Sequence, residues 1–236
     1  MLRYRNTTDQ ELLDQPGLSA TDLYQNMAEL DVINRWLGGH HTTLKGLAKL
    51  MTDKSRTYTI VDVGCGGGDM CRIVHQWAQS NGYKVKLIGL DNNAFILDYA
   101  RAKTAADGPI SYVLGSYQDL PDLVEKPDIL ITALFLHHLF ADDLKRLLWV
   151  MAGYQKVGWV INDLQRHPFA YWGIKLLTSL FSRSHLVRHD APLSVARGFK
   201  RLELQEMINQ ANVGQADITW VWAFRWLIVG RNPYAR

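Results

Sequence analysis

One short stretch of the chain, from Thr59 to Asp69, combines an acid in an apolar run with a cluster of glycines. It reads TIVDVGCGGGD: a run of strand length that contains Asp62 and is followed by glycines at positions 64, 66, 67 and 68. Glycine lets a backbone turn tightly and approach a ligand closely, and backbone N–H groups at such a turn suit nucleotide-like ligands. A carboxylate buried at Asp62 needs a positive or hydrogen-bond-donating partner, which a cationic or amino-bearing ligand would supply. The stretch therefore predicts a nucleotide-like ligand that carries little negative charge.

Spacing separates this turn from two other turns that bind phosphates. A dinucleotide fingerprint needs G-x-G-x-x-G, but after Gly64 and Gly66 the third position is Asp69, whose charge would face a pyrophosphate. A phosphate-cradling loop needs G-x-x-x-x-G-K-[ST], and no such lysine follows. The remaining pattern, D-x-G-x-G-x-G, resembles motif I of the class I S-adenosylmethionine (SAM)-dependent methyltransferases. The resemblance implies that Gly64, Cys65 and Gly66 pack against the methionine part of SAM and that Asp62 lies near its ammonium group.

A second apolar run, Val85 to Leu90, ends in Asp91 and Asn92. An acid about twenty or more residues beyond a glycine turn suits hydrogen bonds to a ribose. The methyltransferase resemblance implies that Asp91 holds the ribose hydroxyls of SAM, with Asn92 beside it in the cofactor site. The alternative is that Asp91 or Asn92 caps the helix that begins near Ala94.

The third and fourth predicted strands bring further candidates for the cofactor site. After the third strand the family often has an acid that reaches the adenine amino group, whereas this chain has Ser116 and then Tyr117. We therefore expect Ser116 and Tyr117 to adjoin adenine through backbone groups and ring contact. At the end of the fourth strand the resemblance adds Leu134 to the cofactor-binding residues.

Two histidines, His137 and His138, follow the fourth predicted strand. Methyl transfer from a sulfonium is an in-line attack by a nucleophile, and a phenol or enol attacks best as it loses its proton. Histidine titrates in the useful pH range. Neighbouring side chains of an extended chain point to opposite sides, so only one of the two can enter the pocket. We expect His138 as general base and His137 as second choice; the alternative is a histidine that only holds the loop by a hydrogen bond.

Three charged residues elsewhere are weighed as contacts for the substrate or the cofactor. Asp163 and Arg166 follow the fifth predicted strand and are candidates for substrate binding, unless Asp163 caps a helix and the rest forms a solvated turn before Pro168. Arg35 is a candidate partner of the SAM carboxylate, because a bidentate guanidinium suits that anion. As an exposed helix arginine it would contribute nothing.

The segment after Arg166 places apolar side chains on one face of a predicted helix. The face contains Phe169, Trp172, Leu176 and Leu180, and Lys175 is its one charge. Three further apolar residues widen it: Tyr171, Ile174 and Phe181. We expect a lid over an aromatic or acyl substrate, with Trp172 among the substrate contacts. A dimer interface and a membrane-surface helix are the alternatives.

The alternation of strand and helix patterns positions these residues on an α/β fold. Such alternation predicts a parallel sheet with right-handed crossovers, and two apolar runs near the end of the chain predict a closing pair of strands. We therefore expect a Rossmann-like, seven-stranded, mostly parallel sheet with an antiparallel last strand, a helical N-terminal extension and a helical lid insertion. The expected single methyltransferase domain, 1–236, comprises a helical cap (1–55), a SAM-binding core (57–163 and 198–230) and the lid insertion (164–197).

Composition excludes several other classes of protein. The 236 residues are 47% hydrophobic and 21% charged, as in an ordinary globular protein, and the net charge of +3 is scattered rather than clustered. These features argue against nucleic acid as a partner, and no apolar run is long enough for stable membrane insertion. The N-terminus does not read as a signal peptide, and two cysteines provide neither a disulfide framework nor a zinc site. We expect a cytoplasmic protein without a metal, with a homodimer as the candidate assembly.

Three motifs narrow the resemblance to small-molecule methyltransferases. ALFLHHL, INDLQRHP and ARGFKRLELQEMINQANV resemble segments of enzymes of ubiquinone and menaquinone biosynthesis and of polyketide-associated methyltransferases. The tetrapeptide of nucleobase methylases is missing after the fourth strand. The resemblance implies SAM-dependent methyl transfer in secondary metabolism to a small apolar, aromatic or polyketide-like acceptor, at oxygen. C-methylation of a quinone-type ring and a SAM-binding accessory subunit without turnover are the alternatives.

Overall fold

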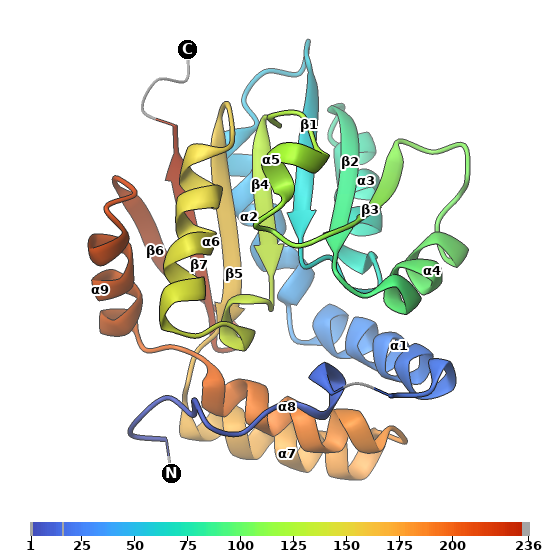
Figure 1. Ribbon diagram of the computed structural model, residues 1–236, viewed down its shortest axis with the longest axis vertical. Coiled ribbons are helices and arrows are strands. Elements are labelled where there is room, and N and C mark those ends of the chain that lie inside the picture. Colours follow the sequence, from blue (N-terminus) through green and yellow to red (C-terminus); the bar gives the residue numbers. More distant parts are fainter. Residues whose placement is uncertain (1, 16, 233–236) are drawn as a thin grey trace.

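The computed structural model describes residues 2–15 and 17–232, within which seven strands form one sheet in the order β3-β2-β1-β4-β5-β7-β6 (Figure 1). The strands are β1 (Thr57–Val63), β2 (Lys84–Asp91), β3 (Ile110–Leu114), β4 (Ile129–Ala133), β5 (Gly158–Leu164), β6 (Ala216–Val221) and β7 (Arg225–Arg231). Among these described strands, β7 runs antiparallel to both β5 and β6, and the remaining pairs are parallel. The predicted fold class is confirmed, including the antiparallel last strand.

Helices and short helical turns connect the strands. They are η1 (Leu12–Asp14), α1 (Ala20–Trp36), α2 (Gly39–Leu50), α3 (Asp69–Ser80), α4 (Ala94–Ala102), α5 (Leu120–Leu123), η2 (Leu136–His138), α6 (Ala141–Gly153), α7 (Pro168–Phe181), α8 (His185–Arg197) and α9 (Arg201–Ala211). Within the predicted helical N-terminal extension, residues 9–15 form only the single turn η1. A proline and a glycine follow it directly in the sequence and disfavour a longer helix.

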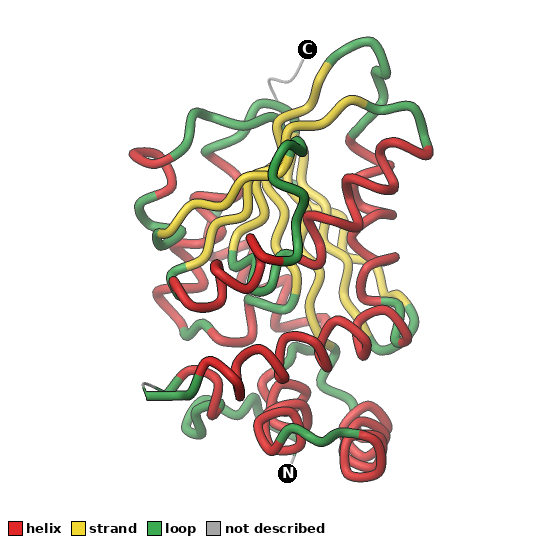
Figure 2. Tube along the Cα trace, turned by 90° about the vertical axis from the view of Figure 1, so that its right-hand side faces the viewer, coloured by secondary structure: helices red, strands yellow, loops and turns green. Residues whose placement is uncertain are grey.

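Helices cover both faces of the sheet, because its strands are apolar on both sides (Figure 2). Side chains alternate along each strand, so Val61 packs in one core with α6 and α9, whereas Ile60 packs in another with α2 and α3. The same alternation separates Leu130 from its neighbours Ile129 and Ile131 in β4. The two cores hold the sheet rigid, so the positions of its strand ends are well defined.

Three helices, α1, α7 and α8, lie across the edge of the sheet where the parallel strands end (Figure 1). Each begins at a side chain that accepts a backbone N–H: Ser19 for α1, His167 for α7 and Ser184 for α8. The cap at α7 corrects the alternative in which Asp163 would cap this helix. Asp163 lies inside β5 and Pro168 is the first residue of α7, a position where proline's missing N–H has no cost. Ligands of open α/β sheets bind at this edge.

Candidate functional site

A cavity of about 610 Å³ lies at the carboxyl ends of β1, β2, β3 and β4, and we call it the glycine-turn cavity. Its lining includes expected cofactor-binding residues from each of these four strand ends, although not Asp62, together with residues of α1. From the predicted set the lining contains Gly64, Cys65, Gly66, Asp91, Asn92, Ser116, Tyr117 and Leu134. The fold therefore brings together residues that are up to seventy positions apart in the sequence.

Glycine is present at positions 64 and 66 of the turn for two different structural reasons. Gly64 has φ +71°, and a Cβ there would come within 2.6 Å of the Phe135 ring. Gly66 has φ +50°, but a Cβ there would meet only Met27 Sδ, at 3.8 Å. Gly64 is thus required by packing, whereas Gly66 leaves open space on the cavity side of a left-handed backbone. That open space is what a closely approaching ligand needs.

Asp91 lies at the lip of this cavity and orders the turn. Its Oδ2 accepts the N–H of Gly66 at 2.9 Å and its Oδ1 accepts the N–H of Asn93 at 3.0 Å. The cap of α4 is Asn93, whose side chain accepts the N–H groups of Phe95 and Ile96, so the reading in which Asp91 or Asn92 caps this helix is wrong. Burial raises the pKa of Asp91, although backbone N–H groups oppose the rise. A carboxylate held in this position is available to a ligand's hydroxyl groups.

Asp62 is buried one layer behind the glycine-turn cavity. It lines a chamber of about 30 Å³ that shares Gly64, Cys65, Asp69 and Leu134 with that cavity. Its side chain is 2% exposed, and among the described residues its Oδ1 has no hydrogen-bond partner. Burial, followed by the charge of Asp69, raises its pKa well above the ordinary value.

The acids at this end of the cavity fit a cationic ligand. Asp69 contacts Nε2 of His40 at 2.7 Å, and Asp31 lies 3.7 Å from the same nitrogen. An ammonium or sulfonium group would relieve the repulsion between these carboxylates and would lower the cost of burying Asp62. The residues present therefore fit SAM, with an acidic end for its methionine part and Asp91 for its ribose.

A second cavity, of about 330 Å³, lies beneath α7 and α8, and we call it the lid cavity. Its walls are mainly apolar side chains from α1, α7, α8 and the turn between β6 and β7. It shares with the glycine-turn cavity the residues Leu13, Leu30, Asn34, Leu134 and His138. The two cavities therefore meet at the end of β4, beside the histidine pair.

Both histidines line the lid cavity, which corrects the expectation that only one of them can. The expectation assumed an extended chain, but His137 and His138 lie in η2, where successive side chains are not opposed. Their ring centroids are 4.4 Å apart. His138 lines the glycine-turn cavity as well, so it lies between the two spaces.

The two rings differ in their partners. Nδ1 of His137 lies 2.8 Å from Oδ1 of Asp163, and both side chains are buried. Nδ1 of His138 lies 3.0 Å from Oδ2 of Asp14, and the His138 side chain is 19% exposed. Burial would raise the pKa of Asp163, but the charge of His137 and its hydrogen bond hold it below the ordinary value. Burial would lower the pKa of His138, but the hydrogen bond with Asp14 and the charges of Glu11 and Asp14 raise it.

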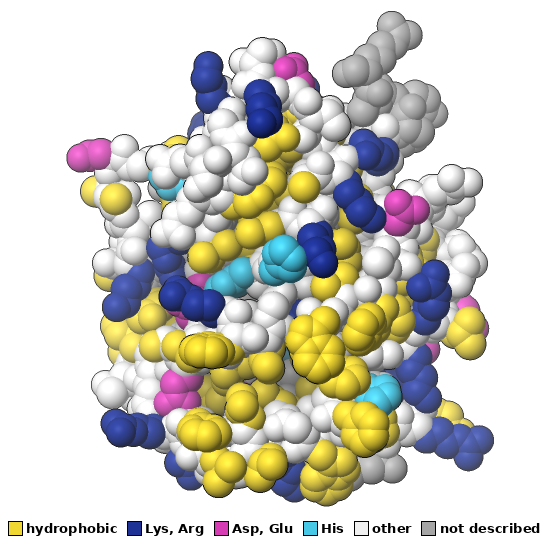
Figure 3. All heavy atoms as spheres, turned by 180° about the vertical axis from the view of Figure 1, so that it is seen from behind, with side chains coloured by type: hydrophobic (Ala, Val, Ile, Leu, Met, Phe, Trp, Pro, Cys, Tyr) yellow, Lys and Arg dark blue, Asp and Glu magenta, His cyan; other side chains and the backbone are white. Residues whose placement is uncertain are grey.

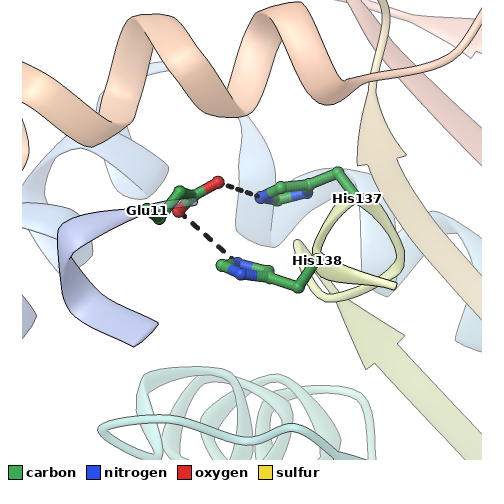
Figure 4. Close-up of side chains that lie close together, drawn as sticks. All are labelled: Glu11, His137 and His138. Atoms are coloured by element: carbon green, nitrogen blue, oxygen red, sulfur yellow. Dashed lines mark ion pairs between the residues drawn. The ribbon is translucent and has the colours of Figure 1, made fainter. Parts of the chain in front are cut away.

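Glu11, just before η1, projects toward both histidines (Figure 4). Its two oxygens lie 3.7 Å from Nε2 of His137 and 3.7 Å from Nε2 of His138. These three side chains offer ligand atoms within 4.8 Å of one another, as a metal site would. Arg197 already places Nη1 3.8 Å from Glu11 Oε1, and Ser194 donates its hydroxyl to the same oxygen. The carboxylate of Glu11 therefore already has a cationic partner in Arg197. That the site holds no metal remains our prediction.

Four predicted site residues lie elsewhere than expected. Arg35 does not line either cavity; its side chain is 66% exposed and lies 3.9 Å from Asp31, because it is on the outer face of α1. Arg166 is buried in an ion pair with Glu203 and is not at the substrate cavity. Asp163 contacts His137 instead of the lid cavity.

The fourth correction concerns Trp172 and the face of α7 to which it belongs. Trp172, Leu176 and Leu180 are 59%, 62% and 66% exposed, whereas Tyr171 and Ile174 are buried against α8. Figure 3 shows hydrophobic side chains gathered on this side of the molecule, around a hollow in its lower part. The lid prediction therefore holds for only part of the predicted face: Phe169 and Ile174 line the lid cavity, whereas Trp172 does not. The homodimer and membrane-surface readings of the outer face stay predictions.

Sequence reasoning missed several residues of the two cavities. Glu11 was not among the predicted site residues, and nothing in the sequence around it signals that it faces a distant histidine pair. Arg225 carries a usable signal, since a charged residue between Phe224 and Trp226 in an apolar strand is costly to bury.

Among the described residues, none of the helices combines the length and apolarity needed to cross a membrane.

Comparisons with known proteins agree with this geometry. A family described as a methyltransferase domain matches residues 60–158, from β1 to the first residue of β5. The mitochondrial ubiquinone biosynthesis O-methyltransferase of Candida albicans is 26% identical over 150 residues, covering 59% of this chain. The chain spans 40% of the length of that relative.

Solved structures show the same fold. A plantazolicin methyltransferase in complex with S-adenosylhomocysteine (SAH) aligns with a TM-score of 0.63 at 13% identity, covering 90% of this chain and 89% of that one. The CurJ carbon methyltransferase aligns with a TM-score of 0.54 at 17% identity, covering 77% of this chain and 50% of that one. At these identities the likeness establishes the fold and leaves the acceptor to the chemistry of the site.

Proposed function

From the premise that this chain carries a SAM-dependent methyltransferase domain, we propose that it methylates an oxygen atom of a small, largely apolar aromatic or polyketide-like molecule. SAM, the cofactor of the domain, supplies an electrophilic methyl group on a sulfonium. One observation carries the proposal: an apolar lid cavity meets the glycine-turn cavity at the histidine pair. An acceptor in the first would face a cofactor in the second.

Residues at the carboxyl ends of the strands would hold the cofactor. Asp91 would accept hydrogen bonds from the ribose hydroxyls, Asp62 and Asp69 would balance the positive charges of the methionine part, and Ser116 and Tyr117 would adjoin the adenine. Asp62 acts from the chamber behind the turn, so its influence is electrostatic. These assignments follow from the fit of charge and position at the glycine-turn cavity.

The proton of the acceptor is taken by His137 in this proposal, with His138 in a supporting role. Asp163 stays ionised and accepts the Nδ1–H of His137, so Nε2 keeps its lone pair on the side of the lid cavity. The raised pKa of His138 reduces the fraction of its ring that is neutral and able to accept a proton. His137 Nε2 would take the acceptor's O–H proton, so that the acceptor oxygen could attack the methyl group that SAM would supply, with S-adenosylhomocysteine as the leaving group.

Carbon methylation of a quinone-type ring is the second candidate. The same base would remove a proton from an enol or phenol whose ring carbon then attacks, and nothing in the lid cavity distinguishes oxygen from carbon as nucleophile. A SAM-binding accessory subunit without turnover is the third. The buried Asp163–His137 pair disfavours it, because such a pair at an apolar cavity has no evident purpose without chemistry.

Labelled methyl transfer tests the proposal. The full-length protein is incubated with methyl-labelled SAM and a panel of phenols, enols and quinols, and products are identified by mass spectrometry and NMR. A methyl ether supports O-methylation, and a methyl group on ring carbon supports the second candidate. Tight SAM binding without a labelled product from any acceptor, including extracts of the source cells, would support the accessory subunit and overturn the enzyme proposal.

A further inference from the structure

Arg225 is the first residue of β7, and its guanidinium is buried at the lid cavity. The residue is 2% exposed and lines that cavity, and it does not line the glycine-turn cavity. Nε donates to the carbonyl of Leu37 at 3.4 Å, and Nη2 donates to Oδ1 of Asn34 at 3.3 Å, both long hydrogen bonds. Among the described residues, Nη1 has no hydrogen-bond partner.

This arginine differs from the other buried arginines of the chain. Arg166 forms an ion pair with Glu203, and Arg197 lies 3.8 Å from Glu11 and donates to two backbone carbonyls. Within the described part of the chain, Arg225 forms no ion pair with a carboxylate. Burial lowers its pKa to about 10, although the charge of Asp163 opposes the change. A buried cation without a direct counter-charge is costly, so the empty donor calls for an anion.

The acids of the lid cavity are already engaged. Asp190 accepts the N–H groups of Leu12 and Leu13 with its two oxygens. Glu11 accepts the hydroxyl of Ser194 and faces the two histidines and Arg197. No described acid of this cavity is therefore free to neutralise Arg225, and the counter-charge has to come with the molecule that enters.

We propose that Arg225 binds a carboxylate of the methyl acceptor, so that the substrate is a hydroxylated aromatic or acyl carboxylic acid. This inference rests on the proposed function, since it specifies the acceptor of the same site. A guanidinium with a free N–H suits a carboxylate, and a charge-assisted hydrogen bond is strongest in an apolar cavity. Asn26 also lines the lid cavity and keeps a buried Oδ1 without a partner among the described residues, as an acceptor for a second hydroxyl. The carboxylate would fix the acceptor at one point and leave its hydroxyl to be presented to His137.

A matched pair of probes tests this assignment without turnover. Hydroxynaphthoate and the corresponding hydroxynaphthamide have the same ring and hydroxyl and differ in charge. Calorimetry on the full chain saturated with SAH gives the affinity for each. We expect the acid to bind at least about tenfold more tightly than the amide, the worth of one hydrogen bond to a charged group. Arg225→Gln should abolish this preference and leave the affinity for the amide within about twofold.

Two variants and one further titration control the experiment. Arg225→Lys should keep part of the preference for the acid, and Arg231→Gln, at the exposed far end of the same strand, should keep all of it. SAH is titrated separately into wild type and Arg225→Gln. An unchanged SAH affinity supports an acceptor site, whereas a loss that matches the loss of acid binding would assign Arg225 to the cofactor's own carboxylate and overturn the proposal.

The wild-type comparison decides the matter even if Arg225→Gln fails to fold. Equal affinities of wild type for acid and amide would sink the inference. Because no methyl transfer is measured, a protein that binds the acid selectively but never methylates would contradict the proposed function and leave this binding result intact.

Discussion

The two cavities that meet at His138 are built in different ways. The glycine-turn cavity is lined mainly by short segments that directly follow β1, β2, β3 and β4. Its functional groups can therefore be recognised from residues that are neighbours in the sequence. The lid cavity takes its walls from η1, α1, η2, α7, α8 and the turn before β7, segments that span almost the whole chain. Its chemistry exists only once these segments have packed.

This difference explains why the glycine-turn cavity suits a cofactor common to many enzymes, whereas the lid cavity can be specific for one acceptor. A strand-end turn can present backbone N–H groups and one carboxylate to a fixed cofactor whatever the surrounding helices do. A cavity assembled from helices changes shape with each apolar side chain on them, and its polar groups need distant partners. Substitutions in the two cavities should therefore separate cofactor affinity from chemistry.

The largest effect is expected from His137. His137→Ala removes the proposed base, so the rate of methyl transfer should fall by roughly 100-fold to 10,000-fold, the range for loss of general base catalysis. Asp163→Asn should lower the rate in the same direction, because an amide can no longer hold the ring with its Nε2 lone pair toward the lid cavity. Single-turnover kinetics measures the rate, and calorimetry with SAH should give an unchanged affinity.

His138→Gln is the matched variant for this first prediction. Its rate should lie well above that of His137→Ala. The opposite order, with His137→Ala near wild type and His138→Gln inactive, would restore the sequence-based choice of His138 as base and contradict the role of Asp163.

The next largest effect concerns the other cavity. Asp91→Ala removes the acceptor of the Gly66 N–H and the proposed partner of the ribose hydroxyls, so SAH should bind about 100-fold more weakly. Calorimetry measures the change, with Asp98→Ala on the exposed side of α4 as control. An affinity for SAH that survives the loss of Asp91 would mean that the carboxylate serves only the turn.

The sequence predicted the glycine-turn cavity and the sheet well for a physical reason. Strand periodicity, glycines that need special backbone angles, and a carboxylate at a strand end are all local properties. Asp91 and Gly66 could therefore be placed from a few neighbouring residues, and the parallel direction of the first five strands followed from their alternation with helices.

The lid cavity could not be predicted in the same way. The choice between His137 and His138 assumed an extended strand, whereas both side chains are set by η2. Periodicity identified a broad apolar face on α7 but not which part of it is buried, because the helices that cover Tyr171 and Ile174 are distant in the sequence. Arg225 is separated from its neighbour Asn34 by more than 190 positions, and no local pattern encodes that distance.

The dependence of stability on pH gives a smaller effect, which involves His138 at the boundary between the two cavities. The folded protein raises the pKa of His138 above 6.5, mainly through Asp14 and Glu11 acting against burial, so protonation stabilises the fold. That contribution is complete below the pKa of the unfolded chain and is lost as the pH rises through the pKa of the folded state. The melting temperature of His138→Gln should therefore fall furthest below that of wild type near about pH 6 and approach it near about pH 9.

Differential scanning fluorimetry over this range measures the gap. Asp14 keeps its charge throughout, because its own pKa is lowered by the hydrogen bond with His138 in spite of burial. His41→Gln, on the exposed side of α2, is the control and should show no such trend. A gap that widened toward high pH would mean that His138 is stabilised as the neutral ring.

The smallest effect is expected on the outer face of α7, where sequence and structure disagree most directly. Replacing Trp172, Leu176 and Leu180 together by Ser should change methyl transfer to a water-soluble acceptor by less than about twofold, because none of them lines the lid cavity. Ile174→Ser, between Trp172 and Leu176 in the sequence but on the inner face, places a hydroxyl in the apolar wall and should weaken acceptor binding more than the triple change does. Steady-state kinetics measures the acceptor dependence of both variants, and their affinity for SAH shows whether the cofactor site is unchanged. If the triple variant lost as much acceptor affinity as Ile174→Ser, the outer face would belong to the substrate path, and the division between an inner wall and an outer surface of α7 would have to be abandoned.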